Sequence, residues 1–162
     1  MARVYSVGQA VYGCAAKGTR PFRLGDTARS LREGRAGPIA VGGTLAAYGF
    51  TRFGVDTVST EVVVRRLTDG AVLATRPATN VVGVESFQSV GSIVVKADGT
   101  VAWIGSDTSI IAHRARDEVH VVSGGFDSVL DSGAGIDVTS LRLDGSSLSW
   151  RDGARMRRAT LH

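Results

Sequence analysis

A short motif occurs four times in this sequence: a glycine, a few small or apolar residues, and then an aromatic residue. It reads GQAVY at residues 8–12, GTLAAY at 43–48, GTVAW at 99–103 and GSSLSW at 145–150. Self-similarity at a period of tens of residues indicates supersecondary units that are stacked or arranged radially. The motif therefore constrains the architecture of the chain more strongly than its chemistry.

Nearly every segment of the chain alternates polar and apolar residues with a period of two, which is typical of strands with one buried face. Asp-Gly occurs four times between such segments, and this dipeptide favours the tight turns of antiparallel hairpins. These pairs are Asp69-Gly70, Asp98-Gly99, Asp144-Gly145 and Asp152-Gly153. We therefore predict an all-β fold, built as an antiparallel meander.

The hairpins divide the chain into four units of similar length within a single domain, 1–162. The units are residues 3–36, 38–82, 84–125 and 128–162. We expect the motif aromatics Tyr48, Trp103 and Trp150 to be buried between units, because large aromatic side chains contribute strongly to cores.

Units of about forty residues with several short strands resemble the blades of a β-propeller. The hairpin SLRLDGSSLSW at 140–150, followed by Gly153, Arg155 and Leu161, is similar to the final blade of exported bacterial propeller-like proteins. The resemblance implies an exported protein with a propeller-like fold.

Closure of such a ring needs about four four-stranded blades. Only the two middle units are long enough for four strands each, so the chain is expected to be part of a larger propeller or to complete a ring as a homodimer. A two-sheet sandwich or a barrel is the alternative fold.

Composition excludes several classes of protein. The net charge of +4 is modest and the arginines are spread along the chain, without the continuous basic stripe of a nucleic-acid-binding surface. No apolar stretch is long enough to span a membrane, and the single cysteine, Cys14, rules out an intrachain disulfide. No signal-peptide pattern opens the chain, so the compartment is left open. We predict no cofactor.

One candidate binding site is the segment HRARDEVH at 113–120. His113 and His120 fall on consecutive predicted strands around a polar turn, where they could approach each other. Together with Arg114 and with Asp117 or Glu118, they form a candidate site for a metal or an anion. The alternative interpretation is a charged hairpin tip.

A second candidate is the segment GAGID at 133–137, which resembles the core of calcium-binding nonapeptide repeats. The resemblance implies that Asp131 and Asp137 supply oxygen ligands to calcium. The alternative is a glycine-rich turn between units.

No complete catalytic constellation is present in the sequence. We therefore expect a non-enzymatic binding or protein-interaction module whose loops contact a protein, a small molecule or a glycan. The alternatives are a propeller-type hydrolase acting on glycans and a structural fragment of a longer exported protein.

Overall fold

The computed structural model of this chain describes residues 2–16, 20–28, 34–54, 58–80, 86–109 and 115–161. Within these ranges the chain forms fourteen strands and no helix, so no helix there could cross a membrane. The strands are β1 (Arg3–Val7), β2 (Ala10–Cys14), β3 (Phe22–Asp26), β4 (Arg35–Gly42), β5 (Leu45–Phe53), β6 (Val58–Arg66), β7 (Val72–Pro77), β8 (Ser86–Val95), β9 (Val101–Ser109), β10 (Ala115–Ser123), β11 (Phe126–Gly133), β12 (Arg142–Asp144), β13 (Ser147–Asp152) and β14 (Arg155–Thr160). The all-β prediction is confirmed.

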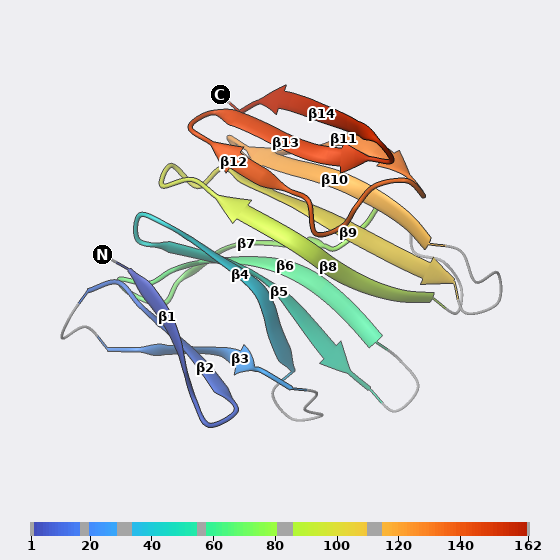
Figure 1. The fold of residues 1–162 in the computed structure, drawn as a ribbon. Helices are drawn as coiled ribbons and strands as arrows, with labels where there is room; N and C mark the ends of the chain where they lie inside the picture. The colour runs from blue at the N-terminus through green and yellow to red at the C-terminus, as the bar shows by residue number, and fades with distance from the viewer. Residues whose placement is uncertain are drawn as a thin grey trace.

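The strands form four layers that follow one another along the chain (Figure 1). The layers are β1–β3, β4–β7, β8–β11 and β12–β14, and within each layer consecutive strands pair antiparallel. The first two layers are joined by one parallel residue pair, Asp26 with Arg35. The antiparallel meander is thus confirmed, whereas no closed ring or barrel is formed by the strands described.

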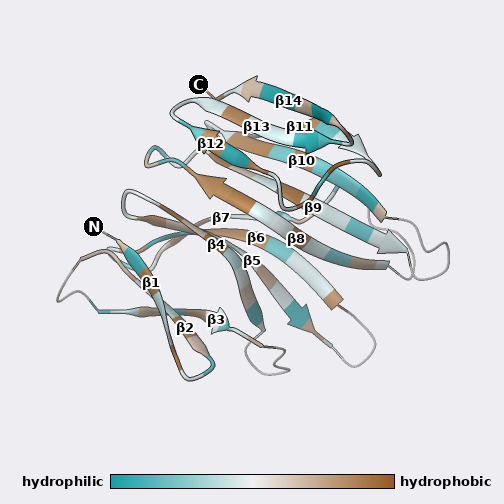
Figure 2. Ribbon diagram, viewed as in Figure 1, coloured by the Kyte–Doolittle hydropathy of each residue, from teal (hydrophilic) through white to brown (hydrophobic). Residues whose placement is uncertain are grey.

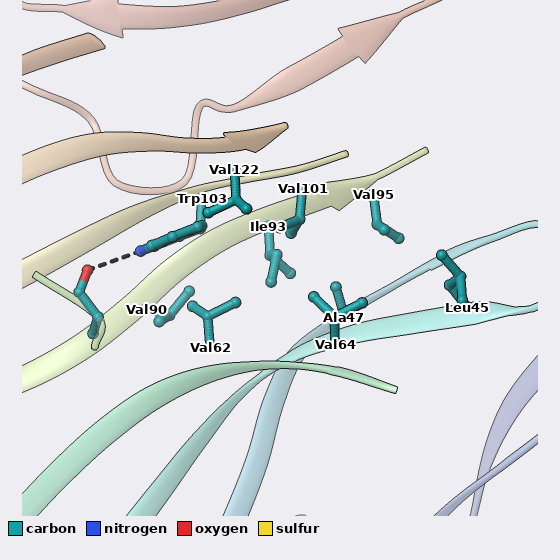
Figure 3. Close-up of a cluster of buried hydrophobic side chains, with 11 residues drawn as sticks. Leu45, Ala47, Val62, Val64, Val90, Ile93, Val95, Val101, Trp103 and Val122 are labelled. Atoms are coloured by element: carbon teal, nitrogen blue, oxygen red, sulfur yellow. Dashed lines mark hydrogen bonds between the residues drawn. The ribbon is translucent and has the colours of Figure 1, made fainter. Parts of the chain in front are cut away.

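Three apolar clusters fill the spaces between the four layers. The cluster between the second and third layers contains Trp103 and the valines that face it from β6 (Figure 3). Tyr48 lies in the cluster between the first and second layers, and Trp150 lies in the cluster between the third and fourth. Each interlayer core therefore contains one motif aromatic, as the sequence predicts.

The Asp-Gly hairpins form at the predicted places, with a different arrangement of the turn. Gly145 and Gly153 have positive φ, but the strand pairs Asp144–Ser147 and Asp152–Arg155 flank them. The two central turn residues are therefore Gly-Ser and Gly-Ala, and each aspartate ends a strand. In the other two hairpins the aspartate side chain accepts a hydrogen bond from the backbone two residues later, as in an Asx-turn.

One unit boundary differs from the prediction. The third predicted unit ends at residue 125, but β11 pairs with β10 across the Gly124-Gly125 turn and belongs to the third layer. Both glycines have positive φ, at 58° and 86°, which suits a tight hairpin turn. The turn therefore lies within a layer instead of between two units.

Candidate functional site

The predicted histidine site is only partly described. His113 and Arg114 lie outside the described residues. Asp117 and His120 both lie on β10, but three positions apart, so they point to opposite faces of the sheet. Asp117 is opposite Ser106, and His120 is opposite Trp103. Asp117 and His120 therefore cannot share a ligand on one face of the strand.

His120 is fully buried between the second and third layers. Its ring stacks on the Trp103 indole with centroids 4.8 Å apart and planes 3° apart. His120 Nε2 lies 3.0 Å from Glu118 Oε2. The other ring nitrogen, Nδ1, lies 3.6 Å from Asp127 Oδ1.

Glu118 joins this buried histidine to the chain that links the two layers. Its side chain is 3% exposed, and its Oε2 accepts a 2.8 Å hydrogen bond from the backbone N–H of Asn80. Trp103 Nε1 donates to the Ala78 carbonyl at 2.8 Å (Figure 3). These contacts pair the Glu118 carboxylate, His120 Nε2 and the Trp103 indole N–H, and they position the linker. His120 and Glu118 are closed to a dissolved substrate.

The two aspartates of the predicted calcium site are hydrogen-bonded within the protein. Asp131 Oδ2, on β11, accepts a 2.8 Å hydrogen bond from Trp150 Nε1 and so ties the third layer to the fourth. Asp137 Oδ1 accepts bonds from the Thr139 backbone and hydroxyl, at 3.0 and 2.7 Å.

Hydrogen bonds from the Thr139 side chain and backbone lower the pKa of Asp137, and the charges of Arg151 and Arg142 contribute. No group of three or more His, Cys, Asp or Glu side chains suited to a metal occurs in the described part of the chain. The calcium interpretation stays a prediction.

A pocket of about 320 Å³ opens between the first and second layers, and we call it the arginine pocket. It is lined by Arg23, Leu24, Gly25, Tyr48, Phe50, Arg52, Glu61, Val63, Arg65, Val72 and Thr75.

Strand alternation and register explain why these side chains share one face. Tyr48 is opposite Val63 and Phe50 is opposite Glu61 in the β5–β6 pairing, so all four point to the same side. Arg65 follows two residues after Val63 on that face. The floor of the pocket is therefore apolar, and charged residues surround it.

Gly25 lets β3 approach the second layer closely. Its φ is +154°, and a Cβ there would lie 2.9 Å from the Ala36 side chain and 3.1 Å from the Phe50 ring. A larger residue would push β3 away from Phe50, so glycine at this position sets the width of the pocket.

The three arginines in the pocket differ in their partners. Arg23 pairs with Asp26 at 2.6 Å, and Arg52 pairs with Glu61 at 2.6 Å. Arg65 makes no ion pair with an acidic side chain of the described residues, and its Nε has no hydrogen-bond partner there. Within the described part of the chain, one guanidinium charge in the lining is therefore left without a carboxylate.

Tyr48 lies beneath this charge. Its side chain is 2% exposed, and burial raises the pKa of the phenol above its ordinary value. The Arg65 guanidinium opposes that shift through its positive charge and a hydrogen bond. The phenol thus stays neutral at physiological pH and helps to position Arg65.

Sequence reasoning missed the arginine pocket because its residues come from four strands in two layers. One signal was available in the sequence: Arg65 continues the face of Val63, where alternation would place another apolar residue. A charge at the end of a buried stripe indicates a polar edge of the core.

Comparison with known proteins gives no relative: no family, no curated protein and no solved structure shows significant similarity to this chain. The fold and the arginine pocket define the chain only as a layered all-β protein with an open, cationic pocket.

Proposed function

We propose that this protein is a non-enzymatic binding module that holds a small ligand in the arginine pocket. The observation that carries the proposal is the contrast between two sites. The buried His120–Glu118 pair is inaccessible, whereas the arginine pocket is open and combines an apolar floor with four charged residues around it. Concave sites with volumes from about 300 Å³ are typical of small-molecule binding, and the charged lining here favours a polar ligand.

The chemistry of the lining favours binding over glycan hydrolysis. Glycoside hydrolysis generally uses two carboxyl groups about 5–10 Å apart. Among the described lining residues Glu61 is the only carboxylic acid, and its Oε2 is engaged by Arg52. Within the described lining, Glu61 therefore has no second acid of the kind that this mechanism requires.

A fragment screen followed by NMR tests the proposal. We expect some small molecules of mixed charge to shift the methyl signals of Leu24, Val63 and Val72, which line the pocket. The methyl signals of Ile104 and Val119, in the core between the third and fourth layers, should not move.

The matched control is a variant in which a larger side chain fills the arginine pocket. Val72 is 50% exposed at the pocket edge, so Val72→Trp should block binding without unfolding the protein. The proposal is wrong if no fragment shifts the pocket methyls at millimolar concentration, or if fragments bind the Val72→Trp variant equally well.

A further inference from the structure

We infer that the ligand of the arginine pocket is a small organic oxyanion, a carboxylate or a phosphate monoester, anchored by Arg65. This inference rests on the proposed binding function and specifies its ligand. The inference starts from the charges in the lining. The Arg23 and Arg52 guanidinium groups each have a carboxylate within 2.6 Å. Arg65 has none among the described residues, so the pocket retains one positive charge that an anion would neutralise.

Arg65 also has an unsatisfied donor. Its Nε is buried and makes no hydrogen bond within the described part of the chain. An unpaired buried donor costs free energy, and a ligand oxygen that pairs with it recovers that cost. The Nε and Nη donors of a guanidinium form a fork that matches the two oxygens of a carboxylate or phosphate. Because Arg65 also lines the pocket, this fork is available to an oxyanion bound there.

The neighbouring groups hold Arg65 in place for this task. Arg65 pairs with Ala46 of β5 and with Val72 of β7, so its backbone is fixed in the middle of the second layer. The Tyr48 phenol, which stays neutral, interacts with the guanidinium without neutralising its charge. The site therefore offers a positioned cation and not a mobile surface arginine.

The walls indicate what the rest of the ligand is like. Phe50 packs edge-on against Tyr48, with centroids 6.3 Å apart, and Leu24, Val63 and Val72 add apolar surface. Arg52 lies over the Phe50 ring at 5.2 Å. An aromatic or short aliphatic body of the ligand would contact these groups while its oxyanion pairs with Arg65.

Three probes of similar shape separate charge from fit: benzoate, phenyl phosphate and the neutral benzyl alcohol. Each is titrated into the full chain at low ionic strength and followed by the methyl signals of Val63 and Val72. We expect the two anions to bind at least about tenfold more tightly than benzyl alcohol. A hydrogen bond to a charged group contributes enough free energy for a change in affinity of that size or more. The tighter of the two anions then identifies the carboxylate or the phosphate as the natural headgroup.

Two variants with the same change in net charge test the anchor. Arg65→Gln should weaken binding of both anions by about tenfold or more and leave benzyl alcohol unchanged. Arg66→Gln is the control, because Arg66 is the next residue on β6, points to the other face and pairs with Asp69 at 2.7 Å. Anion binding to this control should stay within about twofold of the parent protein.

A third variant covers the case in which Arg65→Gln does not fold. Glu61→Gln removes the carboxylate that occupies Arg52, and anion binding should become tighter. The inference is overturned if benzyl alcohol binds as tightly as the anions, or if Arg65→Gln and Arg66→Gln weaken binding equally; the proposed binding function then still stands. If no probe or fragment binds at all, both fail.

Discussion

The first and third layers carry the same glycine-to-aromatic motif, but the aromatic residue has different surroundings in each. Trp103 of the third layer is fully buried against the second layer. Tyr12 of the first layer belongs to none of the three interlayer clusters and stacks on Tyr5, which is 36% exposed, at 5.9 Å. The motif therefore specifies which face of a layer can pack, and burial depends on whether another layer is present.

The direction of packing is the same in every layer that follows another. Tyr48, Trp103 and Trp150 each point back toward the preceding layer. Val11 packs against the second layer, and neighbouring residues of a strand point to opposite faces. Tyr12 therefore points away from the second layer. The outer face of the first layer thus corresponds to a face that packs between layers elsewhere, and no layer among the described residues covers it.

The opposite end of the stack is different. The outer face of the fourth layer carries exposed polar side chains such as Arg142, Arg151 and Arg158, and its edge strand β14 is largely hydrophilic (Figure 2). Terminal units with a polar outer face cap stacked-repeat proteins. The outer face of the fourth layer therefore resembles that of a capping unit, whereas the outer face of the first layer exposes Tyr5. Dimerisation of the chain is still a prediction, and a measurement of the mass of the protein in solution would test it.

The comparison of the first and third layers predicts that the largest loss of stability follows substitution of Trp103. Trp103→Ala should lower the free energy of unfolding by about 3–5 kcal/mol, because it creates a cavity between two layers. It also removes the hydrogen bond to the Ala78 carbonyl and the stacking on His120. Denaturant unfolding followed by circular dichroism measures the loss. A loss below about 1 kcal/mol, the value expected at an exposed site, contradicts the interlayer core described here.

Substitution of Gly105, which lies in the same interface between the second and third layers, should give the next largest loss of stability. The Ala78 carbonyl crosses directly over Gly105, where a Cβ would overlap it. Gly105→Ala should therefore destabilise the protein by about 1–3 kcal/mol through overpacking. The matched control is Gly133→Ala, since a Cβ at that strand position has open space. Equal thermal unfolding midpoints for the two variants would show that the crossing is not tight.

Tyr48 extends the comparison to pH. Its pKa is raised in the folded state by burial, so the folded protein holds the phenol proton to a higher pH than the unfolded chain does. The stability that this contributes is complete below about pH 10 and is lost as the pH rises further. The free energy of unfolding should thus fall more steeply above pH 10 in the parent than in Tyr48→Phe. Parallel pH profiles would contradict the burial of the hydroxyl.

Tyr12 gives the smallest effect. Tyr12→Ala removes a pair of partly exposed rings and should cost about 1 kcal/mol or less, because aromatic pairs contribute about that amount beyond burial. Urea unfolding of this variant beside Trp103→Ala measures the contrast directly. Comparable losses would mean that the outer face of the first layer is covered by another molecule or by a further part of the protein.

The hairpins were predictable from the sequence because their signals are local. Asp-Gly between alternating segments identified four turns, and the recurring aromatics identified the interlayer cores. The sequence misplaced β11 because Gly124-Gly125 resembles a linker, and only the pairing of β11 with β10 shows that it is a hairpin turn.

The candidate site was harder to predict than the fold. Residues Arg23, Arg52 and Arg65 meet only because β3 folds over the face of β5 and β6, and such packing between layers leaves no fixed spacing in the sequence. His120 was singled out as a ligand because its position in the sequence does not show burial. Its stacking on Trp103 depends on the register of β9 with β10, which alternation alone does not determine.

The linker between the second and third layers bears on how such a chain could grow by duplication. Ala78 accepts a hydrogen bond from Trp103, and the Asn80 amide donates to Glu118, so the linker supplies partners to two buried groups of the layer that follows it. If a gene duplication copied β8–β11 without these linker residues, the Trp103 indole N–H of the copy would have no acceptor from the linker. The Glu118 carboxylate of the copy would lose the hydrogen bond that the Asn80 amide donates. The four strands of the third layer therefore depend on the residues that precede them for two of their buried hydrogen bonds.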